Sequence, residues 1–159
     1  MIVTSNYETQ IITITKNGQA KRTRVGTAEK VPDLDANGIQ RLNEDGSLKF
    51  VNDGYRRTKN GAKGITTMKL DEPDEIVAVR QIPDVQDNLF LLTAKGMMIR
   101  VRAEDTKFTK NRSTKGNKIM ELRNKSKTKF EDEIIFAARI PAELINEELT
   151  SDKNSSEEE

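Results

Sequence analysis

The chain has 159 residues, of which 33% are charged and 34% hydrophobic, and its formal net charge is +1. This composition allows one modest core or a few small repeated units. The absence of Cys and His excludes disulfide frameworks, Ser-His triads and the usual zinc ligand sets. No run of 18 apolar residues predicts a membrane span, and the N-terminus lacks the pattern of a secretory signal.

The small net charge hides an uneven distribution. From Glu143 onward there are seven acidic residues and one lysine, which leaves 26 basic and 19 acidic residues in 1–142. Within 95–129, twelve residues are basic and three are acidic. A basic surface of this kind favours a polyanionic partner. We expect 143–159 to form a short helix and an acidic disordered tail, which either keeps the protein soluble or competes with nucleic acid for the basic surface.

Short β-rich runs separated by Asn-Gly and Asp-Gly turn signals predict an all-β fold. In chain order, the expected strands cover 10–15, 48–51, 64–70, 75–82, 88–93, 97–102, 118–122 and 133–140. Only 141–149 has the pattern of a helix, with Pro141 suited to its first position.

Three segments of the chain occur twice in the same order. The pairs are ITITKNGQAKRTR (12–24) with FLLTAKGMMIRVR (90–102), TKNGAKGITTMKL (58–70) with KNRSTKGNKIMEL (110–122), and DEIVAVR (74–80) with DEIIFAAR (132–139), the last with one extra Ala. Repeats of about fifty residues are typical of propellers and arrays of four-stranded units.

The repeats predict the domain organisation. We expect a module over 1–142 with two propeller-like blades, the first over about 7–82 and the second over about 88–140. An insertion at 28–53, with a hairpin-like piece at 39–51, lengthens the first blade. Two blades cannot close a ring, so open blade edges favour a partner chain or self-association.

The repeated unit resembles the blade of the C-terminal domain of type IIA topoisomerase A subunits, which are the A subunit of DNA gyrase and its counterpart in topoisomerase IV. The resemblance rests on the loop and strand in NRSTKGNKIMEL (111–122) and NGAKGITTMKL (60–70), and on the hairpin in LLTAKGMMIRVRAEDT (91–106). It implies a β-pinwheel whose basic rim binds and bends duplex DNA without sequence preference. It also implies that the chain has no catalytic activity of its own.

The family's chemistry uses a tyrosine, ATP and Mg²⁺, and the resemblance implies that these belong to other subunits or segments of an ATP-dependent type II topoisomerase. The chain is then either a fragment or a separately encoded module of a bacterial or phage-encoded cytoplasmic enzyme. Of the gyrase heptapeptide Gln-Arg-Arg-Gly-Gly-Lys-Gly, only Gly61, Lys63 and Gly64 match outright at 58–64. The departure points to a topoisomerase IV-like or divergent, phage-type domain.

The residues predicted to bind DNA are cations on strands and around loop glycines. They are Arg22, Arg24, Arg100 and Arg102 on strands, and Lys59, Lys63, Lys110, Arg112, Lys115 and Lys118 around the loops. Arginines two apart in a strand project from one face, and glycines let backbone N–H groups approach a phosphate. The alternative is that these strands and loops are simply solvated.

Two other features are open at the level of sequence. Residues 33–44 fit a calcium-loop spacing, with Asp33, Asp35, Asn37 and Glu44 as oxygen ligands, or form an Asx-rich turn. The function is also open. The chain binds DNA, or it is an RNA-binding β protein, or it is a protein-interaction module that docks on a partner subunit. We expect this module to bind no other cofactor.

Overall fold

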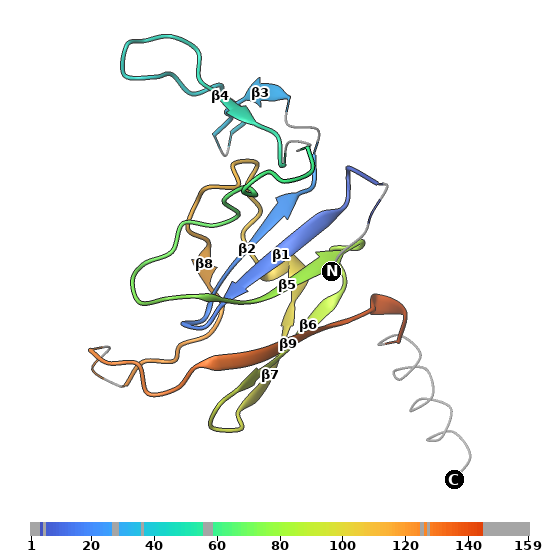
Figure 1. The fold of residues 1–159 in the computed structure, drawn as a ribbon, viewed down its shortest axis with the longest axis vertical. Coiled ribbons are helices and arrows are strands. Elements are labelled where there is room, and N and C mark those ends of the chain that lie inside the picture. The colour runs from blue at the N-terminus through green and yellow to red at the C-terminus, as the bar shows by residue number, and fades with distance from the viewer. Residues whose placement is uncertain are drawn as a thin grey trace.

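The computed structural model describes residues 4, 6–26, 29–35, 37–55, 59–124, 126 and 128–144. Their strands form three antiparallel sheets (Figure 1). The prediction of an all-β fold is confirmed. The helical segments among these residues are two short turns: the 3-10 turn η1 (Ala103–Asp105) and a helical turn at 142–144.

The first sheet has the strand order β5-β1-β2-β8. β1 (Gln10–Thr15) and β2 (Gln19–Arg24) form a hairpin, and β5 (Ile76–Ile82) pairs with the other side of β1. The fourth strand, β8 (Asn117–Lys118), comes from the second repeat of the sequence and pairs with β2. The two repeats therefore share one sheet.

The second sheet has the strand order β7-β6-β9. β6 (Asn88–Thr93) and β7 (Met98–Arg102) form its hairpin, and β9 (Ile134–Ile140) pairs with the other side of β6. In both sheets the third strand carries a register shift next to the hairpin threonine, Thr15 or Thr93. The two units are therefore built on one plan.

Strand pairing corrects one detail of the repeat. Ile76 and Ile82 pair with β1 as Ile134 and Ile140 pair with β6. β5 and β9 are therefore equivalent, with a constant difference in residue number along their length. The second repeat has no extra Ala. An acidic turn precedes both strands. Asp74 accepts the N–H of Asn17, and Asp132 accepts the N–H of Lys95, each from the neighbouring hairpin turn.

The core lies between the two sheets. The alternation of apolar residues along β1 and β6 turns one side of each strand inward. Ile12 and Ile14 of the first sheet form one buried cluster with Leu89 and Leu91 of the second. Met120, which follows β8, closes the cluster. The units are thus joined both by core packing and by β8, which the second unit adds to the sheet of the first.

The predicted insertion forms a separate small sheet. β3 (Lys30–Pro32) pairs with β4 (Phe50–Asn52), and bridges join Leu34 to Gln40 and Leu42 to Leu48. This piece projects beyond the end of the first sheet (Figure 1). Its two ends meet where the Tyr55 N–H donates to the Val25 carbonyl over 2.7 Å.

Two predicted strands differ from the structure. Residues 64–70 form no strand, because no strand edge lies beside them among the described residues. The strand predicted at 118–122 is limited to β8, since the chain then turns so that Met120 and Leu122 enter the core. Of the predicted helix, 142–144 is helical, while 145–149 and the predicted acidic tail beyond it lie outside the described residues.

Candidate nucleic-acid interface

The repeated Lys-Gly phrases form two adjacent segments, which we call the paired loops: residues 59–70 and 110–116. The centre of their arrangement is Lys21 in β2, which is fully buried. Its Nζ donates to the carbonyl oxygens of Thr67 at 2.6 Å and Thr114 at 3.3 Å, and to that of Arg112. One ammonium group therefore holds both loops. Burial, with a smaller effect from the charge of Arg112, lowers the pKa of Lys21 to about 8.

Further hydrogen bonds join the paired loops directly. Arg112 Nη1 donates to the Thr66 carbonyl over 2.7 Å, and the Lys69 N–H donates to the Thr114 carbonyl over 3.2 Å. Lys115 forms an ion pair with Asp71. The two phrases, 52 residues apart in sequence, thus lie side by side in the fold.

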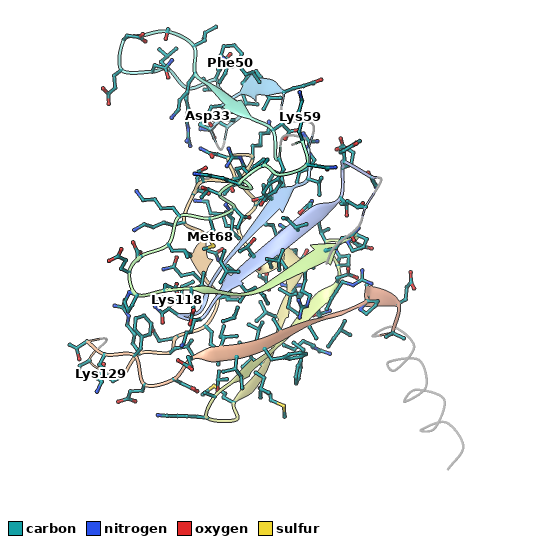
Figure 2. All side chains as sticks on the ribbon, in the orientation of Figure 1. Asp33, Phe50, Lys59, Met68, Lys118 and Lys129 are labelled. Atoms are coloured by element: carbon teal, nitrogen blue, oxygen red, sulfur yellow. The ribbon has the colours of Figure 1, made fainter. Side chains whose placement is uncertain are left out.

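The paired loops present their cations to solvent. Lys59, Lys63 and Lys115 are exposed, while Lys110 and Arg112 are half-buried. Figure 2 shows Lys59 near the small β3/β4 sheet and Lys118 toward the other end of the first sheet, with the buried Met68 between them in this view. The contacts between the paired loops therefore bring Arg112 and Lys115 beside residues 66–71, and we call the surface formed by the paired loops and Lys118 the basic flank.

Two of these cations are engaged in exposed ion pairs. Lys115 faces Asp71, and Lys118 faces Glu121. Surface pairs of this kind contribute about 0–1 kcal/mol to stability. Both lysines therefore remain able to exchange a carboxylate for a phosphate oxygen.

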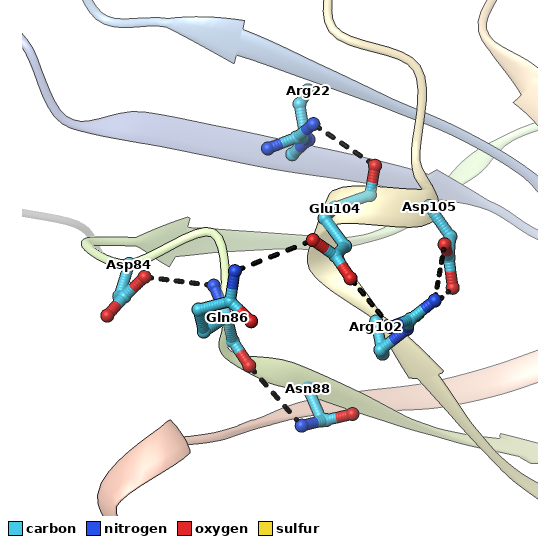
Figure 3. Close-up of polar contacts among 7 residues, drawn as sticks. All are labelled: Arg22, Asp84, Gln86, Asn88, Arg102, Glu104 and Asp105. Carbon is cyan, nitrogen blue, oxygen red and sulfur yellow. Dashed lines mark hydrogen bonds and ion pairs between the residues drawn. The ribbon is translucent and has the colours of Figure 1, made fainter.

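Arg22 corrects the prediction that the β2 arginines project from an open face. It is only 8% exposed. Its Nε donates to the Thr106 carbonyl over 3.0 Å. Its Nη2 donates to the Glu104 carbonyl over 3.3 Å, as Figure 3 shows. Residues 104–109 of the second unit lie across β2 and cover this side chain. Arg22 is therefore a contact between the units and is largely closed to solvent.

Arg24 also has partners within the chain. Its guanidinium pairs with Glu8 and Asp53, each at 2.6 Å, and the two carboxylates raise its pKa. The local sequence shows no acidic residue opposite Arg24, but the fold brings these two to it. A phosphate would have to displace both carboxylates.

The β7 arginines are exposed as the alternation predicts. Ile99 and Val101 pack against the core, and Arg100 and Arg102 face solvent. Arg102 pairs with Glu104 at 2.8 Å and Asp105 at 3.3 Å (Figure 3). Arg100 has no ion pair with any described residue, so it is the more accessible of the two.

The calcium-loop spacing falls on the inserted sheet. Asp35 Oδ1 accepts the N–H groups of Asn37 and Ile39 at 2.8 and 2.9 Å, which is an Asx turn. Asp33 pairs with Lys49 at 3.3 Å. Within the described residues no group of three or more acidic side chains is placed to hold a metal ion. Calcium binding here stays a prediction.

Sequence reasoning missed Lys21, which fixes the paired loops, and Lys69, an exposed lysine within them. A signal for Lys21 was present in the repeat: the aligned position in the second unit is Ile99, a core-facing residue. A lysine at a core position of a repeat indicates a buried cation that needs acceptors. No such signal marks Lys69.

The fold and this flank define a class of protein. The second of two hairpin-based units supplies strand β8 to the sheet of the first. Their repeated Lys-Gly loops form a basic surface that has no recognition helix among the described residues. Such a surface offers phosphate contacts. The class is therefore a propeller-like repeat module with a basic flank.

Comparison with known proteins agrees with this class. The family described as "DNA gyrase C-terminal domain, beta-propeller" matches residues 9–52, 48–83 and 87–141. The DNA gyrase A subunit of Metamycoplasma arthritidis is 33% identical over 109 residues, which are 68% of this chain and 11% of that protein. The DNA gyrase A subunit of Campylobacter jejuni is 28% identical over 153 residues, which are 96% of this chain and 14% of that protein.

Among solved structures, the C-terminal domain of DNA topoisomerase IV has a similar fold. Its TM-score is 0.57 at 18% identity, over 88% of this chain and 33% of that one. The chain belongs to the DNA gyrase C-terminal domain family. The predicted resemblance to the β-pinwheel domain of type IIA topoisomerase A subunits is thereby confirmed.

The family model matches the chain in three segments. Two of them, 9–52 and 48–83, lie in the region that the repeats predict to be one blade with an insertion. The chain spans only 11–14% of the length of the two gyrase relatives described above. Among the described residues, no helix has both the length and the apolar character needed to cross a bilayer.

Proposed function

We propose that this chain binds double-stranded DNA through its phosphates, without sequence preference, and bends it as the accessory C-terminal part of a type IIA topoisomerase. The observation that carries the proposal is the pairing of the two Lys-Gly loops by Lys21, Arg112 and Lys69 on one flank. A set of cations held on one surface neutralises successive phosphates and releases counterions.

The proposed contact residues are exposed or half-buried cations of that flank, with one strand residue added. They are Lys59, Lys63, Lys69, Lys110, Arg112, Lys115 and Lys118, together with Arg100. In this proposal Arg102 contributes once DNA displaces its surface ion pairs. Arg22 is left out because it is buried.

Strand passage by this enzyme would need a tyrosine nucleophile, ATP and Mg²⁺, and the proposal assigns these to other segments or subunits. The module contributes binding and bending alone. With bacterial duplex DNA as the partner, the site of action is the bacterial cytoplasm, whether the gene is bacterial or carried by a phage.

The proposal is tested with charge-matched variants. The loop variant combines Lys59→Gln, Lys63→Gln and Lys110→Gln. The control combines Arg80→Gln on β5 with Lys95→Gln and Lys129→Gln, which lie on other segments of the chain. We expect the loop variant to lose most of its affinity for a labelled random-sequence duplex, and the control to lose much less. Equal losses would show that net charge, and not the paired loops, governs binding.

Competition separates the alternatives in nucleic acid. Unlabelled duplexes of unrelated sequence should displace the labelled duplex equally well, because phosphates carry no sequence information. Double-stranded RNA of equal length should compete less well, because the A-form helix presents its phosphates along a different path. Stronger competition by RNA would favour the RNA-binding alternative.

A further inference from the structure

The two units differ at one edge. In the first sheet, β8 covers the outer edge of β2, with Gln19 opposite Lys118 and Ala20 opposite Asn117. In the second sheet, β7 is the edge strand, and no described residue pairs with its outer side. The positions equivalent to Gln19 and Ala20 are Met97 and Met98.

The side chains at this edge are apolar and open. Met97 is 51% exposed and Met98 is 62% exposed, whereas Ala20 is fully buried. Leu92 lies opposite both Met98 and Phe136, so these three residues form an apolar row across the second sheet. An uncovered strand edge beside an apolar row is a site for strand addition.

The equivalent row of the first sheet shows what such a row is built to contact. It consists of Ile14, with Ala20 and Ala78 opposite on its two sides. All three are buried in the cluster shared with the second unit. The fold thus already contains one interface in which a unit of this type covers that row and supplies a strand to that edge.

The complementary half of the same junction pairs with no strand among the described residues, and its Thr66 carbonyl accepts a hydrogen bond from Arg112 Nη1 over 2.7 Å. Residues 64–66 of the first unit are the sequence equivalents of 116–118, which include β8. A Cβ on Gly116 would lie 2.1 Å from the Ala20 carbonyl oxygen, because this backbone runs close along β2. A Cβ on Gly64 would have nothing within 4 Å. Gly64 supplies a glycine at the equivalent position, where its φ is 87°, and residues 64–66 pair with no strand among the described residues.

Leu70 supports the same conclusion. It is 36% exposed, whereas its equivalent, Leu122, is 3% exposed inside the core. Leu122 packs under the first sheet with Met120 as the chain leaves β8. A partner sheet placed on 64–66 would cover Leu70 in the same way.

We propose that two copies of this chain associate head to tail, with residues 64–66 of one copy adding as an antiparallel strand to the outer edge of β7 of the next. The register follows the internal junction, so Thr66 of one copy lies opposite Met97 of the other, and Ile65 lies opposite Met98. Leu70 then covers the row formed by Leu92, Met98 and Phe136. The interface joins two different surfaces, so it allows rings or longer arrays.

The test uses cross-linking, which is clean because the native chain has no Cys. One variant carries Met97→Cys and the other carries Thr66→Cys, both at solvent-facing positions. We expect a mixture of the two variants to form a disulfide-linked dimer under mild oxidation, and each variant alone to form little. Lys59→Cys mixed with Met97→Cys is the out-of-register control and should behave like the single variants.

Two outcomes overturn the proposal. A strong cross-linked dimer from Met97→Cys alone would show symmetric pairing of two β7 edges. Cross-linking of the mixture no better than the Lys59→Cys control would show that 64–66 does not reach β7.

Light scattering gives an independent readout on the native chain. The mean mass of the wild type should rise with protein concentration, and Met97→Lys with Met98→Lys should hold the protein at the monomer mass, because charges on an edge strand oppose pairing. Circular dichroism checks that this variant keeps its sheets. A wild type that stays monomeric at every concentration contradicts the proposal.

Discussion

Arg22 and Arg100 occupy equivalent positions in the two hairpins, and only Arg100 is open to solvent. Arg22 lies opposite Ile12 in β1, and Arg100 lies opposite Phe90 in β6. Residues 104–109 cover Arg22 and supply carbonyl acceptors to its guanidinium. No described segment covers Arg100. The same residue type at the same repeat position therefore serves the fold in one unit and is available for binding in the other.

This pair gives the first prediction. Arg22→Ala should lower the free energy of unfolding by about 2–4 kcal/mol, because buried carbonyl groups lose a charged donor. Arg100→Ala should change it by less than about 0.5 kcal/mol, as for most surface substitutions. Arg100→Ala should also weaken duplex binding. The slope of log affinity against log salt concentration should become less steep by about 1. Urea unfolding and duplex titration measure the two effects, and an exchange of the two results would contradict the assignment.

Lys21 gives a pH-dependent prediction. Burial lowers its pKa to about 8 in the folded chain, from an ordinary value of 10.5. Between these two values the unfolded chain binds more protons at this group than the folded chain does. The contribution of Lys21 to the free energy of unfolding therefore increases from pH 8 to 10.5, by at most about 3 kcal/mol.

The measurement compares urea unfolding of the wild type and Lys21→Met at several values between pH 7 and 10.5. The difference between them isolates Lys21 from the other lysines and tyrosines that titrate in this range. It should move in favour of the wild type as the pH rises. A difference that stays constant would mean that the buried ammonium keeps its ordinary pKa.

A substitution at Gly116 tests the pairing of β8 with β2. Gly116→Ala places a methyl group against the Ala20 carbonyl oxygen at 2.1 Å and should cost about 1–3 kcal/mol through overpacking. Ser113→Ala, an exposed change in the same loop, should cost less than about 0.5 kcal/mol. Hydrogen exchange should show faster opening of β2 in Gly116→Ala. Unchanged protection of the β2 amides would argue against the pairing of β8 with β2.

The ion pair between Lys115 and Asp71 gives a prediction about binding. Lys115→Gln should weaken binding equally for duplexes of different sequence. The slope of log affinity against log salt concentration should become less steep by about 1. Asp71→Asn should strengthen binding, because Lys115 loses its competing carboxylate. Glu44→Gln, which makes the same charge change on the inserted sheet, is the control for net charge. Equal gains from Asp71→Asn and Glu44→Gln would remove Lys115 from the proposed interface.

Local patterns predicted the hairpins well. The glycines at 18 and 96 and the alternation along β1 and β6 are features of neighbouring residues, so the sequence reveals them. Strand pairing between distant segments is not local. Residues 64–70 and 116–122 have nearly the same pattern, and only the second includes a strand, because only it has the β2 edge beside it.

The candidate site was predictable in part for the same reason. The Lys-Gly loops were evident as a repeated phrase, but their contact depends on Lys21, which bonds to residues 46, 91 and 93 positions away. The strand arginines look alike in sequence. Arg22 is buried by a segment of the other unit, and spacing within β2 carries no information about that segment.

The most direct test of the central claim is fluorescence anisotropy of a labelled random-sequence duplex, titrated with the protein at about 50 and about 200 mM salt. Six or more phosphate contacts predict a loss of roughly a thousandfold in affinity over that range. This result would support a module that binds DNA through its phosphates. Absence of binding at the lower salt concentration, or binding that does not change with salt, would contradict it.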